Sequence, residues 1–252
     1  MTLRRPTLDE WFNAYQHRHI TREHSFMPGF VSVDVTAVVR DWEARGERAP
    51  FPAILAKAAA LAAVEHPQAN RLYLRTLWGD RVAELDGVHI NLPMRMRHGE
   101  RHVLTVNVLR DADRRSVAEL RDEIWGHVRG GLGGTTLTKL VATRPNTWYW
   151  RLVLRVLHFV VWRWPLVPRY GGAITVTCPT TVPREGRPRW FTGPSPTALL
   201  IALSEVRKEA DRTWLDLGVM ADHLVLDGVD GLAFADTFAD ILEGKRGVEL
   251  LR

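Results

Sequence analysis

The sequence predicts a single α/β domain, residues 1–252, in which helices flank a mixed β-sheet. Segments whose apolar residues recur at helical spacing alternate along the chain with short β-like segments. No internal repeat or low-complexity linker interrupts this alternation. A chain of 252 residues is also long enough for a well-buried core.

The N-terminal half is expected to begin with a helix from Thr7 to about Gln16, because Thr7 is a good N-cap and apolar residues follow it at helical spacing. Alternating residues at Phe30–Val35 predict a strand with one buried face. The Ala- and Leu-rich segment Phe51–Glu65 predicts a helix that is buried on most sides and ends before Pro67. The remaining elements of this half are a helix at Thr36–Arg45 and strands at Arg71–Leu77, Val88–Arg95 and Val103–Arg110.

In the C-terminal half, Ser116–Val128 predicts an amphipathic helix with one apolar stripe. The glycines of residues 130–134 predict a flexible joint. They are not a dinucleotide-binding loop, because no G-x-G-x-x-G follows a strand and opens a helix here. The remaining elements are strands at Ile174–Cys178, Ala198–Ser204 and Trp214–Met220 and a last helix at Val229–Leu242.

Residues 147–164 form a nearly continuous apolar and aromatic segment that Pro165 ends. It is about as long as a membrane span, but it contains Arg151, Arg155 and Arg163. Each arginine would cost roughly 2.5–3.5 kcal/mol at the centre of a bilayer, so a transmembrane helix is not expected. Two interpretations remain open. The segment is either a core or subunit-interface helix, or an interfacial helix that lies on a membrane or covers a lipophilic pocket.

Composition narrows the classes of partner and compartment. The formal net charge is +5 at pH 7, and the basic residues are scattered without an aromatic–basic RNA signature, so no nucleic-acid partner is expected. The single cysteine, Cys178, excludes an internal disulfide and a cysteine-based zinc site, and it fits a reducing compartment. The segment Met1–Pro6 lacks the apolar stretch of a signal peptide, so a cytoplasmic location is expected.

The run Asp222-His223-x-x-x-Asp227-Gly228 joins a mostly apolar strand segment to the last helix. A strand that ends in a turn and starts a helix would present His223 at the turn. Histidine is the side chain best placed to move protons near neutral pH. A lone histidine could also simply cap the end of a strand, so the other stretches of the chain must decide between the two interpretations.

Four further stretches accompany this run in a fixed order. They are Val31–Thr36, the Ala-rich stretch 52–67 with its His-Pro end, Val106–Asp113 with its Arg-Asp-Ala-Asp turn, and Gly171–Cys178. The ordered set resembles the catalytic domain of the dihydrolipoyl acyltransferases of 2-oxo acid dehydrogenase complexes, and its relative chloramphenicol acetyltransferase. The similarity covers most of residues 28–243. It implies a chloramphenicol acetyltransferase-like mixed sheet with flanking helices.

The resemblance also implies a mechanism. The family's motif histidine, matched by His223, is the general base toward the acceptor or toward the thiol of coenzyme A or dihydrolipoamide. A hydroxyl on the Gly-Gly strand, matched by Thr177, donates a hydrogen bond to the oxyanion. The motif aspartate, matched by Asp227, is expected to hold the local structure through an ion pair with an arginine. Candidates for that arginine are Arg4, Arg5 and Arg18. The family pattern further implies a homotrimer in which the histidine and the hydroxyl come from different chains.

Several residues depart from the family pattern. No lipoyl domain, subunit-binding domain or long Ala/Pro linker is present, so membership of a dehydrogenase complex is not expected. Leu224 stands where complex members usually carry arginine, and Met220 replaces a small polar residue. The Gly-Gly strand continues as Cys178-Pro179-Thr180, without the usual Asn-Leu-Gly. These changes predict a stand-alone enzyme whose acceptor is more apolar.

The sequence therefore predicts an acyltransferase that moves an acyl group from a thioester, on coenzyme A or a carrier protein, to a small apolar acceptor. The thioester is a co-substrate, and neither a tightly bound cofactor nor a metal is expected. Cys178 need not act as a nucleophile, and His17, His19 and His24 are interpreted as surface residues. Two alternatives remain: a non-catalytic trimeric assembly or binding protein, and a membrane-peripheral lipid-binding protein that works through residues 147–164.

Overall fold

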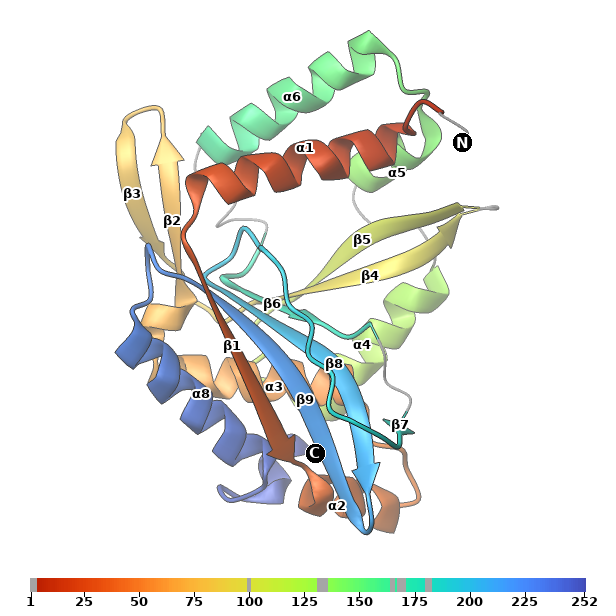
Figure 1. The fold of residues 1–252 in the computed structure, drawn as a ribbon, viewed down its shortest axis with the longest axis vertical. Helices are drawn as coiled ribbons and strands as arrows, with labels where there is room; N and C mark the ends of the chain where they lie inside the picture. The colour runs from red at the N-terminus through yellow and green to blue at the C-terminus, as the bar shows by residue number, and fades with distance from the viewer. Residues whose placement is uncertain (1–3, 99–100, 131–135, 164–165, 167–170, 180–182) are drawn as a thin grey trace.

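The computed structural model describes residues 4–98, 101–130, 136–163, 166, 171–179 and 183–252 (Figure 1). Within them, seven strands form one sheet in the order β1-β9-β8-β6-β4-β5, with β7 paired to β8. The sheet is mixed, because β6 runs parallel to β4 and β8 whereas the β1–β9, β8–β9 and β4–β5 pairs are antiparallel. The strands are β1 (Phe26–Asp34), β4 (Ile90–His98), β5 (Arg101–Leu109), β6 (Ile174–Thr177), β7 (Pro183–Arg184), β8 (Leu199–Glu209) and β9 (Arg212–Asp222). The predicted mixed α/β fold is confirmed.

One group of helices shares a single apolar core with one face of this sheet. These helices are α2 (Thr36–Ala44), α3 (Phe51–Glu65), α4 (Val117–Gly130) and α8 (Gly228–Leu242). Two short 3₁₀ turns, η1 (Pro67–Asn70) and η2 (Val248–Leu251), follow α3 and α8. A separate hairpin of β2 (Arg71–Thr76) and β3 (Gly79–Glu84) lies beside the main sheet.

A second group of helices lies together at one end of the molecule (Figure 1). It consists of α1 (Leu8–Glu23), α5 (Thr136–Thr143) and α6 (Trp148–Arg163). Their shared apolar cluster is small and is centred on Leu8, Phe12, Val141 and Leu154. A capping box starts α1: Thr7 Oγ1 accepts a hydrogen bond from the backbone N–H of Glu10, and the carboxylate of Glu10 accepts one from the backbone N–H of Thr7.

Most predicted elements are present, with shifted ends. The first helix extends to Glu23, seven residues beyond Gln16, and β1 begins at Phe26 instead of Phe30. Strands β8 and β9 are likewise longer than expected. Neither β3 nor α5 was predicted. Residues 131–134 of the expected glycine joint, Thr180, and the Trp164–Pro165 end of the aromatic segment lie outside the described residues.

Several of the sequence stretches named above contact one another inside the core. The Ala-rich helix α3 carries a buried lysine, Lys57, whose Nζ donates a hydrogen bond to the carbonyl oxygen of Asp113 (2.6 Å). Burial lowers the pKa of this lysine. At the other end of α3, Nε2 of His66 lies 2.8 Å from Oγ1 of Thr237 in α8. The Ala-rich helix thus ties the Arg-Asp-Ala-Asp turn to the helix that follows the histidine motif.

The start of β6 is fixed by a glycine. The side-chain amide of Asn91 donates to the carbonyl oxygen of Gly172 (2.8 Å) and accepts from its backbone N–H (2.9 Å). A Cβ atom on Gly172 would lie 1.6 Å from the carbonyl oxygen of His89, so a larger residue does not fit. This close approach explains the second glycine of the Gly-Gly pair, and it sets the position of Thr177 five residues later.

Helix α6 is not a core helix within one chain. Its arginines and His158 contact α1, and most of its apolar residues are exposed. The interpretation of residues 147–164 as a core helix is therefore wrong for the single chain, whereas a subunit-interface or membrane-surface role is left open. In the described part of the chain, no helix is long and apolar enough to cross a membrane.

Candidate active site

His223 lies in the turn between β9 and α8. Strand β9 ends at Asp222 and α8 begins at Gly228, as the sequence predicts. The backbone N–H of His223 donates to the carbonyl oxygen of Ser25 (2.6 Å), which fastens the turn to the start of β1. The imidazole itself is exposed and has no hydrogen-bond partner among the described residues. Its ring nitrogens are therefore free to exchange a proton with a bound molecule.

A buried pair of side chains holds this turn in place. Nδ1 of His24 lies 2.6 Å from Oδ2 of Asp222, and the two side chains are only 8% and 2% exposed. The other carboxylate oxygen of Asp222 accepts hydrogen bonds from the backbone N–H groups of Ser25 (3.3 Å) and Leu224 (3.2 Å). Asp222 is thus bound to His24 and Ser25 at the α1–β1 junction, and Leu224 is bound to Asp222.

The expectation that His24 is a surface residue is wrong. His24 and Asp222 are 198 positions apart, and no local pattern links them. The neighbouring histidines have other surroundings: His17 is exposed, and Nε2 of His19 lies 3.2 Å from Oε2 of Glu23. In the part of the chain that the structure describes, no group of three or more potential metal ligands converges.

Asp227 supports the turn as a helix cap. Its Oδ1 accepts hydrogen bonds from the backbone N–H groups of Val229 and Asp230, both at 2.8 Å. Such a cap stabilises a helix by about 1 kcal/mol. The expected ion pair with an arginine is absent among the described residues. Of the three candidates, Arg4 instead pairs with Glu10. The scaffolding role of Asp227 thus has a different physical origin from the one expected.

Thr177 is the last residue of β6 and is half-buried. Ile174 and Val176 point into the core, so Thr177 lies on the opposite face of the sheet. Cys178 follows it, and burial raises the pKa of its thiol to about 12. This thiol is protonated at neutral pH, which makes it a poor nucleophile.

The register of the sheet separates Thr177 from His223 within one chain. Thr177 pairs with Ala202, and Ala202 pairs with Gly218, so Thr177 is level with Gly218 and two strands away from it. His223 lies five residues beyond Gly218. With strands about 4.8 Å apart and a rise of about 3.4 Å per residue, the two side chains are separated by roughly 20 Å. A general base and an oxyanion donor must both contact one reacting carbonyl group, so a single chain cannot supply this pair to the same substrate.

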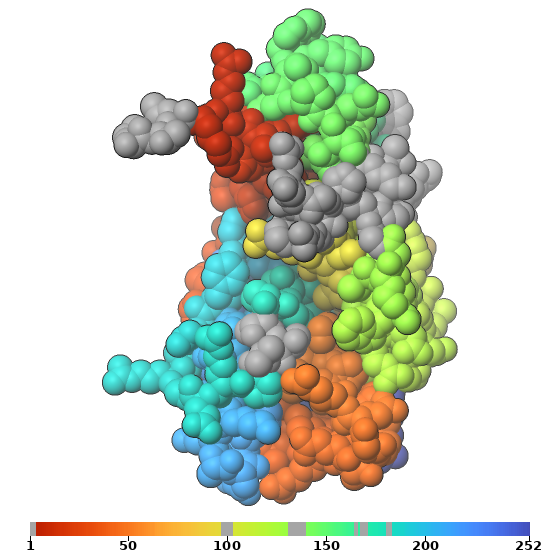
Figure 2. Space-filling view, turned by 90° about the vertical axis from the view of Figure 1, so that its right-hand side faces the viewer, coloured from red at the N-terminus to blue at the C-terminus, as the bar shows by residue number. Residues whose placement is uncertain are grey.

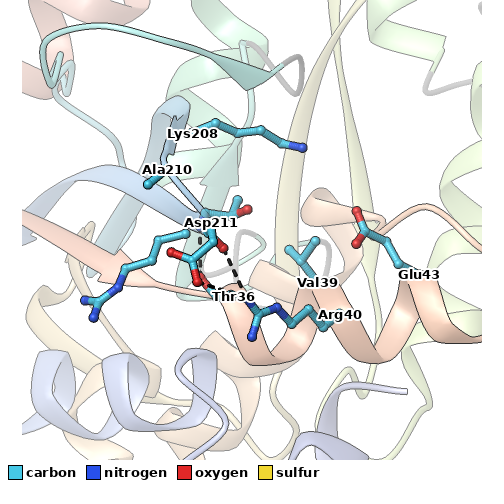
Figure 3. A pocket seen from close by; sticks show the side chains of 9 residues that line it. Thr36, Val39, Arg40, Glu43, Lys208, Ala210 and Asp211 are labelled. Carbon is cyan, nitrogen blue, oxygen red and sulfur yellow. Dashed lines mark hydrogen bonds and ion pairs between the residues drawn. The ribbon is translucent and has the colours of Figure 1, made fainter.

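Two hollows in the described surface lie away from these residues. A hollow of about 140 Å³ lies between α2 and the β8–β9 hairpin, at the end of β9 far from His223 (Figure 3). Two of its charged side chains, Arg40 and Asp211, pair with each other (3.3 Å). A second hollow of about 340 Å³ lies between α3 and the Leu85–Val88 segment. Neither hollow is lined by His223, Thr177 or Asp227.

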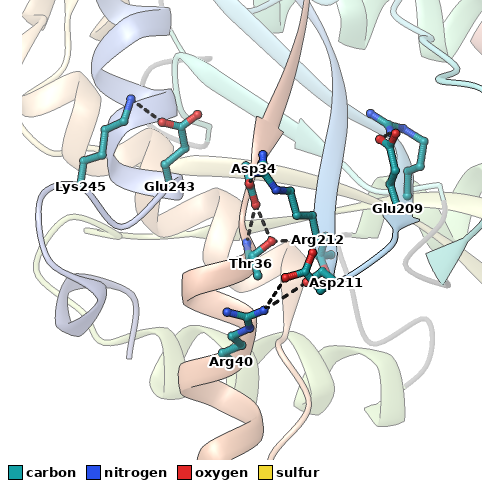
Figure 4. A network of polar contacts seen from close by, with 10 residues as sticks. Asp34, Thr36, Arg40, Glu209, Asp211, Arg212, Glu243 and Lys245 are labelled. Atoms are coloured by element: carbon teal, nitrogen blue, oxygen red, sulfur yellow. Dashed lines mark hydrogen bonds and ion pairs between the residues drawn. The ribbon is translucent and has the colours of Figure 1, made fainter.

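A polar network beside the first hollow has a structural role (Figure 4). Asp34 accepts a hydrogen bond from the backbone N–H of Thr36 (3.0 Å), and Oγ1 of Thr36 accepts one from the backbone N–H of Thr213 (2.9 Å). Arg212 lies 3.7 Å from Asp34. The Asp34-Val-Thr36 stretch of the sequence therefore joins β1, α2 and β9 and does not belong to the candidate active site.

No family model matches the sequence, and a search of curated proteins finds no match. Solved structures do match. The cubic core of a pyruvate dehydrogenase multienzyme complex superposes with a TM-score of 0.66 at 18% identity, over 98% of this chain and 93% of that one. The chain has the fold of acyltransferase cores. Dihydrolipoamide acetyltransferase of Azotobacter vinelandii gives the same values, and chloramphenicol acetyltransferase gives a TM-score of 0.52 at 15% identity, over 96% and 98% of the two chains.

Replacing His24 by alanine is expected to loosen the His223 turn. The buried carboxylate of Asp222 would lose one partner, which costs about 1–3 kcal/mol of unfolding free energy. If His223 is a catalytic base, its displacement would lower the turnover rate by about tenfold or more. Denaturant unfolding and steady-state kinetics measure the two effects. His24→Asn, which keeps a donor, should lose less than His24→Ala, and His17→Ala should change neither quantity. Full turnover by a folded His24→Ala protein would show that the pair does not position His223.

Proposed function

We propose that the protein is an acyltransferase that moves an acyl group from a thioester, on coenzyme A or a carrier protein, to a small acceptor. The observation that carries this proposal is the exposed imidazole of His223, which makes no hydrogen bond among the described residues. It lies on a strand–helix turn that the His24–Asp222 pair holds in place, within the fold of acyltransferase cores. The structural study of the Azotobacter enzyme concerns a serine, a histidine and an asparagine in its catalytic mechanism. Here we assign the hydroxyl to Thr177 and the histidine to His223, whereas Asp227, four residues after His223, caps α8.

The active site is completed between two copies of the chain. The separation of roughly 20 Å between Thr177 and His223 requires a second copy to bring a threonine hydroxyl to the histidine. A homotrimer in which each copy supplies His223 to one neighbour and Thr177 to the other builds identical sites by rotation. The likeness to a subunit of a multienzyme core supports this arrangement.

In the proposed reaction, His223 removes the proton from the acceptor's hydroxyl, amine or thiol group as that group attacks the thioester carbonyl. The electron pair of the C=O bond moves onto oxygen, and the hydroxyl of Thr177 donates a hydrogen bond to the resulting oxyanion. When the oxyanion collapses, the carbon–sulfur bond breaks, and the proton held by His223 passes to the leaving sulfur. The thioester is consumed as a co-substrate, and the steps use no tightly bound cofactor or metal.

The residues around His223 support an apolar acceptor. Leu224 follows it directly and is partly exposed, and Val229 and Leu232 at the start of α8 are 77% and 69% exposed. Exposed apolar side chains in this number beside a candidate base are typical of a binding or subunit surface. In the proposed assembly they line the space between the two copies in which the acceptor binds.

Release of free thiol from acyl-coenzyme A tests the proposal. The purified protein is incubated with acyl-coenzyme A of several chain lengths and a panel of small apolar alcohols, amines and thiols. We expect acceptor-dependent thiol release by the wild type and formation of the acylated acceptor. If neither acyl-coenzyme A nor an acyl-loaded carrier protein is turned over with any acceptor, the enzyme proposal fails. A non-catalytic trimeric assembly or binding protein would then be the better account.

A further inference from the structure

Helix α6 lies at one end of the molecule (Figure 2), and a set of its apolar side chains is exposed. Six residues at helical spacing on this helix are between 37% and 77% exposed: Trp148, Tyr149, Leu152, Val156, Phe159 and Val160. We call them the α6 outer face. A helix on a protein surface normally turns its apolar side inward, so this orientation requires an explanation.

The orientation of α6 is fixed by the polar residues on its inner side. The guanidinium groups of Arg151 and Arg155 lie 5.4 Å and 5.5 Å from the ring centre of Trp11 in α1. The imidazole of His158 is buried, 5.2 Å from the ring of Tyr15. Burial, followed by the nearby charges of His19 and Arg163, lowers the pKa of His158 to about 4, so it is neutral at pH 7. These contacts hold the apolar side of the helix outward.

The helical group that carries the α6 outer face has an excess of positive charge. Residues 124–184 contain no aspartate or glutamate. Residues 4–23 and 136–163, which include α1, α5 and α6, contain nine lysine and arginine residues and only three aspartate and glutamate residues. Glu10 and Glu23 are already paired with arginines. Arg144 and Arg155 are exposed and have no carboxylate partner among the described residues.

We infer that the α6 outer face docks on the surface of an anionic lipid membrane. Apolar side chains along one face of a helix can enter the boundary between headgroups and acyl chains, and flanking arginines attract anionic headgroups. Trp148 and Tyr149 at the start of the helix have the amphipathic rings that favour this boundary. A second copy docked face to face on the same helix would bring like charges together. The inference does not depend on the acyltransferase proposal.

Vesicle co-sedimentation tests the inference with two lipid compositions, phosphatidylcholine alone and phosphatidylcholine with about one-third phosphatidylserine. We expect the full-length protein to bind the anionic vesicles at least tenfold more tightly than the neutral ones. Leu152→Glu with Phe159→Glu should abolish this binding. Arg144→Glu should reduce it by about fivefold or more, because each arginine near the surface contributes roughly fivefold. Raised salt should also weaken it.

Trp125→Glu provides the matched control, because Trp125 on α4 is similarly exposed but lies outside the α6 outer face. This control should bind vesicles like the wild type. Circular dichroism and thiol release without vesicles should be unchanged in all variants. The inference is overturned if the wild type does not bind anionic vesicles. It is also overturned if Leu152→Glu with Phe159→Glu leaves vesicle binding intact, or if its main effect is to split the oligomer in sedimentation velocity, since the face would then be a contact between copies.

Discussion

Replacing His223 by alanine is expected to lower the rate of thioester turnover by about 10²–10⁴-fold, the contribution of a positioned general base. The loss should appear mainly in kcat, because the imidazole acts on the proton that moves in the transition state. The side chain is exposed and makes no hydrogen bond within the described residues, so unfolding free energy should change by less than about 0.5 kcal/mol. Thiol release measured at equal protein concentration gives the comparison.

Two further measurements separate catalysis by His223 from a structural effect. Added imidazole should restore part of the activity of His223→Ala, because the exposed position leaves room for a small base. His17→Ala, which removes another exposed histidine, should leave turnover unchanged. Unaltered turnover by His223→Ala would remove His223 from the mechanism, whatever the fate of the fold.

Replacing Thr177 by alanine is expected to lower kcat by about 10²–10³-fold, the usual effect of losing one oxyanion donor. The KM for the thioester should change little, because the hydrogen bond strengthens only as charge develops on the oxygen. Thr177→Ser keeps the hydroxyl and should retain most of the activity, whereas Thr177→Val keeps the shape and should behave like alanine. Equal rates for the serine and valine variants would contradict the proposed role of the hydroxyl.

The sequence predicted the interior of the fold better than its periphery. Helix α3 and strand β8 were found because their apolar residues are nearly continuous, as is usual for a buried element. The second half of α1 was missed because residues 17–23 are polar apart from Ile20. That half is held by contacts with α6 that local spacing does not encode, such as the ion pair between Glu23 and Arg163 (2.7 Å).

In the candidate active site, too, features set by local sequence could be predicted, whereas contacts between residues far apart in the sequence could not. The position of His223 on a strand–helix turn could be predicted, because the transition from strand to helical spacing is local. The His24–Asp222 pair could not, since its members are joined only by the pairing of β1 with β9. Asp227 was assigned a scaffolding role through an arginine, but its carboxylate caps its own helix. An aspartate one residue before a helix is a strong local signal for that cap.

The central claim is that His223 of one copy and Thr177 of another form each active site, and mixed assembly tests it most directly. His223→Ala and Thr177→Ala proteins are denatured together, refolded, and assayed for thiol release beside each variant refolded alone. We predict that the mixture recovers about a quarter of wild-type activity, because that share of sites in a symmetric ring combines an intact histidine with an intact threonine. If the mixture stays as inactive as its parents while refolded wild type regains activity, the two residues do not meet between chains.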